Sequence, residues 1–289
     1  MDNPIPEQKT SIWIKIGAVI LFLVFGSLIM VVFSPWRPLL NPAADLLGRV
    51  GLITLLGVGT WQAKKSRVFY QLWPMLSGLT IMAVAVSMMW LTANYLIDHL
   101  GLNSTTPSGF ALLKLNDMVV VFVVVLVLSR LMGFEFSDLY LQKGKVRLGL
   151  LLGVGTFVLA AAISIPSGIW LFKLDPAKLT GWREWLPWLG VFVLANGAME
   201  EMLFRGLFLK KFEPLLGEFL SIFTIALVFT ALHYGVSYTS QQLIFMGILI
   251  GLALLFGTVI QKTRSLWPAM LFHAGMDISV MLGIFSNLK

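Results

Sequence analysis

Long, predominantly apolar runs separated by short polar segments repeat along the whole chain. The first run, 16–33, is longer than the hydrophobic part of a signal peptide, which has about 7–15 residues. It therefore predicts an uncleaved membrane span. A helix that crosses a bilayer needs about 20 apolar residues, and the same pattern predicts further spans at 46–63, 72–97, 113–132, 148–171, 187–209, 219–236, 243–261 and 267–286. Span 46–63 is the weakest because it is short and carries Arg49; a tilted or re-entrant course is its alternative.

The composition places the chain among integral membrane proteins. Hydrophobic residues make up 58% of the 289 residues and charged residues only 12%, whereas a soluble globular chain has about 45–50% apolar and about 25% charged residues. The mean hydropathy is +0.87. A soluble enzyme, a disordered protein and a nucleic-acid-binding domain are therefore excluded. We expect an all-α, polytopic bundle of about eight or nine transmembrane spans in a lipid bilayer, without room for a second, soluble domain.

The basic residues indicate an orientation in the membrane. The chain has 21 Lys and Arg against 14 Asp and Glu, which gives a net charge of +7. With nine spans and the N-terminus inside, about two thirds of the Lys and Arg fall in inside segments, as the positive-inside rule expects. Every tryptophan except Trp90 lies near a predicted helix end, where amphipathic rings prefer the membrane interface.

The absence of cysteine excludes disulfides, a thiolate zinc site and a cysteine nucleophile. It also fits a bacterial plasma membrane, with a cytoplasmic N-terminus, as the expected location; an endomembrane is the alternative.

Two prolines predict local features of helices. Pro166 predicts a kink within its span, and Pro268 suits a first helical turn.

Glycines four residues apart predict close helix packing within the chain, with dimerisation as the alternative. Such pairs occur at Gly149 and Gly153 and at Gly247 and Gly251.

Ionisable side chains inside the predicted spans are the candidates for chemistry, because charge inside a bilayer is costly. They are Glu200, Glu201, His233, His273 and Asp277. Glu201 and Arg205 are four residues apart on one helix face, so they can pair. Glu200 is rotated by about 100° from Glu201 on the helix. A simple stabilising ion pair therefore explains only one of the two glutamates.

The two histidines have ordinary explanations when taken singly. His233, with Phe229 four residues before it, can be an interfacial or hydrogen-bonded residue, and His273 can make a satisfied polar contact with Asp277. Together with Glu200, they can converge on one buried site. Such a set can activate a water molecule, because a desolvated carboxylate becomes a better base near neutral pH. It can also bind a divalent metal such as zinc. The motifs HExxH and GxSxG are absent, which disfavours those hydrolase mechanisms.

The predicted boundaries leave these residues at different depths. Counted along ideal helices, Glu200 and His273 fall toward the inner side and His233 falls nearer the outer side. They meet only if span 219–236 enters the membrane later, for example near Phe223. Candidate supporting groups without a defined role are Asn196, Thr230 and Tyr234.

Three motifs in the second half of the chain resemble a known family. They read EEMLFR at 200–205, FTALH at 229–233 and HAGMD at 273–277, in this order and on predicted helices. The ordered set resembles the CPBP family, also called the Abi family, of CAAX prenyl endopeptidases and bacteriocin-processing enzymes. The resemblance covers about the second half of the chain. It divides the sequence into a polar N-terminal tail, transmembrane helices without a recognised motif and a catalytic transmembrane core, at 1–10, 11–144 and 145–289.

The resemblance implies an intramembrane endopeptidase that cleaves near the C-terminus of a lipidated or membrane-associated peptide or protein. Carried over by motif, Glu200 is the general base that activates water, and His233 assists it. Glu201 and Arg205 support the site, together with Phe229 from the second motif.

The third motif implies that His273 and the residue at 277 stabilise the oxyanion. An asparagine at that position donates a hydrogen bond, whereas Asp277 donates only if it is protonated, as burial can achieve. Otherwise Asp277 orients His273 or ligates a metal. A metal-free and a metal-assisted mechanism both stay open, the second with the ligands Glu200, His233, His273 and Asp277.

Two other function classes compete with a protease. A non-enzymatic immunity or scaffold protein can keep the motifs as a structural polar cluster. A proton- or ion-coupled transporter can also use buried glutamate and histidine, but the chain shows no inverted repeat of the transporter kind. The sequence does not specify the substrate, the need for prenylation or the oligomeric state.

Overall fold

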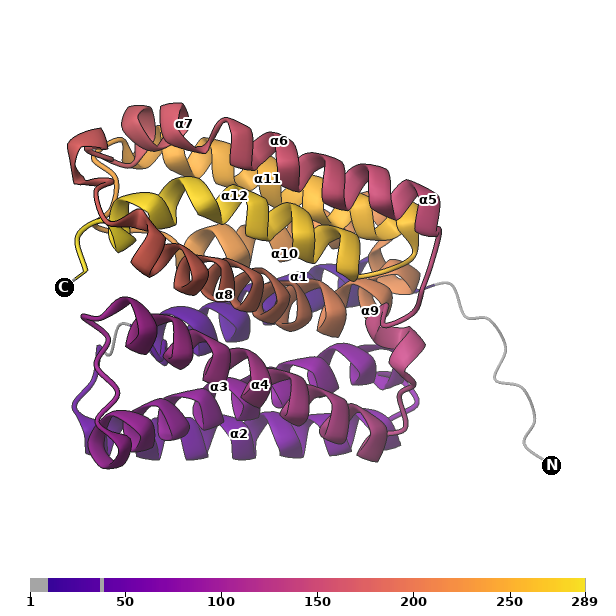
Figure 1. Cartoon of the computed structure of the whole chain (residues 1–289). Helices are drawn as coiled ribbons and strands as arrows, with labels where there is room; N and C mark the ends of the chain where they lie inside the picture. Colours follow the sequence, from indigo (N-terminus) through magenta and orange to yellow (C-terminus); the bar gives the residue numbers. More distant parts are fainter. Residues whose placement is uncertain (1–9, 37–38, 289) are drawn as a thin grey trace.

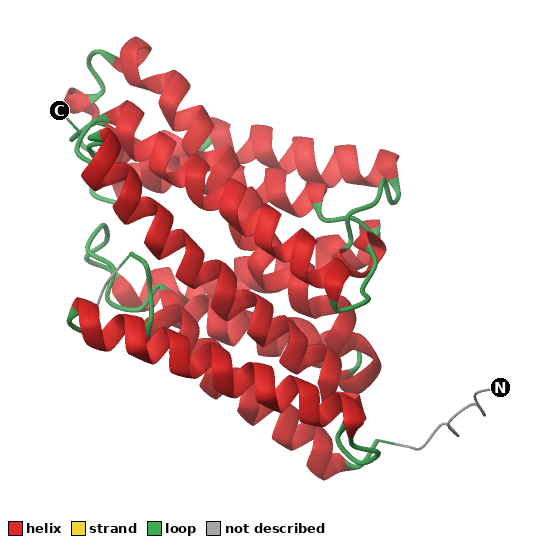
Figure 2. Cartoon of the chain, turned by 90° about the horizontal axis from the view of Figure 1, so that it is seen from below, coloured by secondary structure: helices red, strands yellow, loops and turns green. Residues whose placement is uncertain are grey.

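The structure, a computed structural model, describes residues 10–36 and 39–288 (Figures 1 and 2). These described residues consist of helices and connecting loops, with no strand among them. The all-α prediction is therefore confirmed. The predicted polar tail lies, except for Thr10, outside the described residues.

Within the described part of the chain, one helical segment is present for each predicted span. The first four are α1 (Ile12–Ser27) continued by the π-helical η1 (Leu28–Val32), α2 (Pro42–Lys65), α3 (Trp73–Leu100) and α4 (Pro107–Leu131). The fifth is interrupted and consists of α5 (Val146–Gly149), η4 (Leu150–Val154), α6 (Gly155–Ala162) and α7 (Ser164–Leu171). The sixth joins α8 (Trp182–Glu201), η6 (Met202–Gly206) and α9 (Leu207–Leu216), and α10 (Glu218–Leu232), α11 (Gln242–Thr263) and α12 (Trp267–Phe285) follow it. Single 3-10 turns in the connections are η2 (Tyr70–Leu72), η3 (Phe136–Leu139) and η5 (Pro176–Lys178).

The structure supports an integral membrane protein. By length and composition, 6 of the described helices can cross a membrane: Ile12–Val32, Pro42–Lys65, Tyr70–Leu100, Pro107–Leu131, Gln242–Thr263 and Trp267–Phe285. The count rises to 7 if the bent segments Val146–Ala162 and Ser164–Leu171 together form one span. The expected count of eight or nine is thus approximate. The segment α8–α9 carries polar residues that lower its hydropathy, and α10 has only 15 residues.

The weakest predicted span is a continuous helix, α2, of 24 residues rather than a re-entrant loop. Arg49 is buried in it and pairs with Asp45, with 3.1 Å between Nε and Oδ2. The guanidinium also lies 5.0 Å from the ring centre of Trp90. A paired and stacked arginine is tolerated at this depth. The same contact explains why one tryptophan lies in the middle of a span.

Both proline predictions are confirmed. The fifth segment breaks at Ile163 with a bend of 62° between α6 and α7. Pro166 causes such a break because its ring clashes with the carbonyl four residues earlier and it lacks an N–H donor. Pro268 lies in the first turn of α12, where a backbone N–H has no acceptor within the helix, so its absence costs no hydrogen bond.

The two glycine pairs differ. A Cβ on Gly153 would lie 2.9 Å from Pro268 Cα, and one on Gly149 would lie 2.5 Å from the Trp267 ring. This pair therefore permits the close approach that its spacing predicts. Around Gly247 and Gly251 there is open space instead, so the prediction of packing within the chain is wrong for this pair.

The helix α8 lies in the middle of the bundle (Figure 1). It packs against α12 on one side and against α4 on the other, and α2 and α3 lie beyond α4. The polar residues of α8 are thereby shielded from lipid by other helices. This placement allows a polar site to lie inside the apolar bundle where α8 meets α12.

Candidate active site

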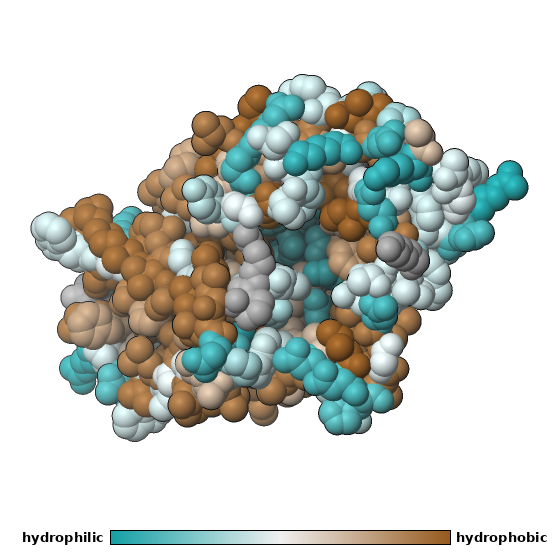
Figure 3. Space-filling model, turned by 90° about the vertical axis from the view of Figure 1, so that its left-hand side faces the viewer, coloured by the Kyte–Doolittle hydropathy of each residue, from teal (hydrophilic) through white to brown (hydrophobic). Residues whose placement is uncertain are grey.

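A cavity of about 590 Å³ brings the predicted residues together. It is lined by Glu200 of α8, His233 directly after α10, and His273 and Asp277 of α12. Figure 3 shows a hollow at the end of the molecule where α7 and the C-terminus lie, with hydrophilic surface at its bottom and apolar surface on the flank. The cavity therefore connects a buried polar cluster with one end of the bundle.

The predicted pair of Glu201 and Arg205 is present and fully enclosed. Arg205 Nη1 donates to Glu201 Oε1 at 2.9 Å, and Nη2 donates to the Ala253 carbonyl of α11 at 3.0 Å. The two side chains are 0% and 1% exposed. The guanidinium lies 4.4 Å from the ring centre of Phe229. Charge pairing and stacking together make this burial tolerable.

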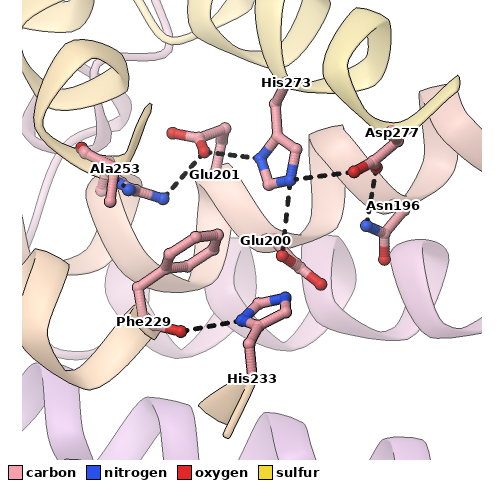
Figure 4. Close-up of polar contacts among 9 residues, drawn as sticks. Asn196, Glu200, Glu201, Phe229, His233, Ala253, His273 and Asp277 are labelled. Carbon is pink, nitrogen blue, oxygen red and sulfur yellow. Dashed lines mark hydrogen bonds and ion pairs between the residues drawn. The ribbon is translucent and has the colours of Figure 1, made fainter. Parts of the chain in front are cut away.

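His273 connects both glutamates with the aspartate (Figure 4). Its Nδ1 lies 2.8 Å from Glu201 Oε1, and its Nε2 lies 3.6 Å from Glu200 Oε2 and 3.6 Å from Asp277 Oδ1. The ring is stacked on Phe256 of α11, with 4.8 Å between ring centres. A carboxylate can only accept, so Nδ1 carries a proton toward Glu201, and Nε2 is directed into the cavity.

Glu200 faces the cavity while Glu201 faces away from it, as their rotation on the helix predicts. The Oε2 atom of Glu200 is buried and accepts no hydrogen bond from the described residues. On the other side of the cavity, His233 Nδ1 is 3.0 Å from the Phe229 carbonyl, which orients the ring. In Figure 4 the carboxylate of Glu200 points into the space between the rings of His273 and His233.

The convergence does not need a later start of the helix. The helix α10 begins at Glu218, close to the predicted start of its span. Instead, α9 continues to Leu216, beyond the predicted end at 209. Glu200 and His233 are therefore nearly equally far, about 24 Å along the helices, from the turn that joins α9 and α10.

Gly217 forms that turn. Its φ of +80° lies in a region that residues with a side chain rarely adopt. One glycine thus allows α10 to begin immediately and to run back along α9 and η6. The equal depth of the first two motifs follows from this tight connection.

The close contact between α8 and α12 depends on Gly197. A Cβ there would lie 2.8 Å from the Met270 carbonyl oxygen and 2.9 Å from the Ala274 nitrogen. The absence of a side chain lets the two backbones approach so that the side chains of Glu201 and His273 can meet. Directly after Glu201, η6 is a π-helical turn, a feature that is frequent at functional sites.

Asn196 has a defined place that the sequence did not assign. Its Nδ2 donates to Asp277 Oδ2 at 2.9 Å, and it lines the cavity one helical turn before Glu200. Phe256 and the carbonyl of Ala253 also belong to the site, although α11 carries no recognised motif. Phe256 is one of 21 phenylalanines, so no sequence signal could have selected it.

The candidate ligand set does not fit a metal ion in this arrangement. Among the described residues, no group of three or more His, Asp or Glu side chains is placed to hold one. Of the four candidate ligands, His273 directs its Nδ1 to Glu201 Oε1, and Asp277 Oδ2 accepts a hydrogen bond from Asn196. We therefore derive no step through a metal.

The comparison with protein families gives one match. Residues 182–279, about a third of the chain, match the family model described as type II CAAX prenyl endopeptidase Rce1-like. This segment begins with α8 and ends within α12, so it contains all three motifs. The match confirms the family resemblance found in the motifs. Comparisons with curated proteins and with solved structures each gave no match.

Proposed function

We propose that the chain is an intramembrane endopeptidase that hydrolyses a peptide bond of a lipidated or membrane-associated peptide or protein. The observation that carries this proposal is the environment of Glu200. Its carboxylate is 5% exposed, has an unpartnered Oε2 among the described residues and lies in a cavity with two histidines. The match to the prenyl endopeptidase family supports the reaction class.

Glu200 acts as the general base in this mechanism. It takes a proton from a water molecule that His233 helps to hold, and the hydroxide oxygen attacks the carbonyl carbon of the scissile bond. The electron pair of the carbonyl moves to its oxygen. When the tetrahedral intermediate collapses, the C–N bond breaks, and Glu200 gives its proton to the leaving amine. The products are a carboxylic acid and an amine, which exchange a proton to become a carboxylate and an ammonium group.

His273 stabilises the oxyanion through its Nε2–H. A ring with protons on both nitrogens donates from Nδ1 to Glu201, which fixes its orientation, and presents Nε2–H to the cavity. The aspartate at position 277 accepts a hydrogen bond from Asn196, so the amide group contributes the donor that an aspartate lacks. Removal of one oxyanion donor typically lowers kcat by about 100- to 1000-fold.

The cavity walls favour an apolar substrate. Trp170, Phe172 and Phe245 line the cavity beside the polar cluster, and such rings cover lipid or apolar side chains. Trp36 and Lys114 come from outside the matched segment, so the first half of the chain contributes to substrate choice. We infer a cytoplasmic N-terminus from the charge pattern and a bacterial plasma membrane from the absence of cysteine.

The test is proteolysis by the purified chain in detergent. A library of prenylated and unprenylated C-terminal peptides, with and without a chelator, is incubated with the wild type, Glu200→Gln or Glu184→Gln. Glu184 lies exposed in the first turn of the same helix, so its variant is a matched control. We expect cleavage by the wild type and the control and none by Glu200→Gln. Equal cleavage by all three overturns the role of Glu200, and a folded wild type without any activity favours an immunity or scaffold protein.

A further inference from the structure

A second cavity, of about 480 Å³, lies at the other end of the bundle from the mouth of the active site. Its walls come from the connections α2–α3 and α4–α5 and from α9 (Figure 1). Residues that line it include Tyr70, Gln71, Phe134, Asp138, Lys210 and Lys211. At this end the last turn of α2 and the α2–α3 connection are basic, with Lys64, Lys65 and Arg67. The positive-inside rule assigns such an end to the cytoplasmic leaflet.

Lys211 is an unusual residue in this cavity. Its side chain is buried, at 9% exposure, and its Nζ has no hydrogen-bond partner among the described residues. The ammonium lies 4.5 Å from the ring centre of Phe134. Asp138, which lines the same cavity, pairs with Lys210 at 3.4 Å. A buried ammonium with three unsatisfied donors is unfavourable unless a ligand supplies acceptors.

Gln71 supplies a second unsatisfied group. Its Oε1 is buried and accepts no hydrogen bond from the described residues. A matching ligand therefore has an anionic acceptor for Lys211 and a donor for Gln71. The charges of Lys210, Lys211 and Asp138 sum to +1, which favours a ligand with one negative charge.

Apart from Thr10, the remaining walls are apolar and aromatic. Pro74, Pro214 and Leu215 line the cavity, and a stack of Tyr70, Trp73 and Phe134 lies beside it, with 6.1 and 5.0 Å between ring centres. Aromatic rings of this kind gather at the depth of lipid head groups. Apolar walls around a cation suit the glycerol and first acyl carbons of a lipid, whereas free phosphate would leave them uncovered.

We propose that this cavity binds an anionic phospholipid whose head group combines one phosphate with hydroxyl donors, as in phosphatidylglycerol. The phosphate accepts from Lys211 Nζ, and a head-group hydroxyl donates to Gln71 Oε1. Basic pockets between membrane helices on the cytoplasmic side bind anionic lipids in this way. This site is separate from the proposed peptidase cavity, and neither proposal depends on the other.

The test is lipid binding by the full chain in a neutral detergent, followed by native mass spectrometry. Phosphatidylglycerol, phosphatidylcholine with the same acyl chains and inorganic phosphate are titrated separately. The variants are Lys211→Met, which removes the charge but keeps an unbranched side chain only one atom shorter, and Lys143→Met, which removes the same charge at an exposed position outside the cavity.

We expect the wild type and Lys143→Met to bind phosphatidylglycerol equally and more tightly than phosphatidylcholine. Loss of a hydrogen bond to a charged group weakens binding by about 10- to 100-fold in Lys211→Met. If Lys211→Met does not fold, Gln71→Leu is the second variant, with an expected loss of about tenfold. Unchanged binding by the folded variant overturns the proposal. If inorganic phosphate at the same concentration displaces phosphatidylglycerol, the proposal that the ligand is a lipid is wrong.

Discussion

His273 Nδ1 and Arg205 Nη1 share one acceptor, the Oε1 atom of Glu201, at 2.8 and 2.9 Å. A single buried oxygen thus connects α8 with α12 and orients the imidazole ring of the third motif. The partner Glu200, one residue earlier, is left to face the cavity. The adjacent glutamates therefore have different tasks, one holding the site together and one available for proton transfer.

Arg205→Met should destabilise the protein strongly, because it leaves the Glu201 carboxylate buried beside His273 without its guanidinium. Breaking a buried pair by removing one partner costs about 3–5 kcal/mol. Thermal unfolding in detergent measures the loss, with exposed Arg147→Met as the control. The double variant with Glu201→Gln should lose less than the sum of the single variants. Additive losses would show that the pair is not coupled.

Asp277→Asn should keep activity within about tenfold of the wild type, because an amide accepts from Asn196 and can also donate to an oxyanion. Asp277→Leu removes the acceptor for Asn196 and should lower kcat by about 100-fold or more. Initial rates on the same peptide check both values. A leucine variant with wild-type kcat would remove Asp277 and Asn196 from the mechanism.

Gly197→Ala should separate α8 from α12. Its Cβ would lie 2.8 Å from a backbone oxygen, and overpacking of this kind costs about 1–3 kcal/mol. The matched control is Gly190→Ala on the same helix, where nothing lies within 4 Å of the added Cβ. We expect a lower melting temperature and reduced activity only for Gly197→Ala. Equal effects of the two variants would contradict the close contact.

The pH dependence of stability should reveal the protonation of Lys211, which lies beyond the predicted span 187–209. Burial lowers the pKa of this lysine to about 7, despite the opposing charge of Asp138; Lys210 lowers it further. Tyr70 is the other titratable group on the cavity wall. Between pH 7 and the ordinary lysine pKa of about 10.4, the unfolded chain binds more protons at this site, so the free energy of unfolding rises with pH.

Melting temperatures between pH 7 and 9, in detergent without anionic lipid, check this prediction. The rise is at most about 1.4 kcal/mol per pH unit. It should be absent in Lys211→Met and present in Lys143→Met. At higher pH, Tyr140 acts in the opposite direction, because burial and its hydrogen bond to Glu213 raise its pKa. A flat profile of the wild type below pH 9 would contradict the lowered pKa of Lys211.

Much of the fold was predictable because a membrane span depends on the apolar composition of one continuous segment. The apolar runs located every helical segment, and Pro166 located the break in the fifth one within three residues. The ends of helices were less predictable. Helix α9 extends past 209 although Lys210 and Lys211 follow there, because the packed end of the bundle can hold charged residues that hydropathy assigns to a loop.

The sequence by itself determined the all-α membrane class, the family motifs and the pairing of Glu201 with Arg205, since these depend on residue type and spacing along one helix. Only the tertiary structure decided the depth of His233, the bond between Glu201 and His273 and the contributions of Asn196 and Phe256. Those relationships join different helices. They depend on a turn at Gly217 and on a close approach of two helices at Gly197. The sequence pattern of a single helix does not predict distances to other helices.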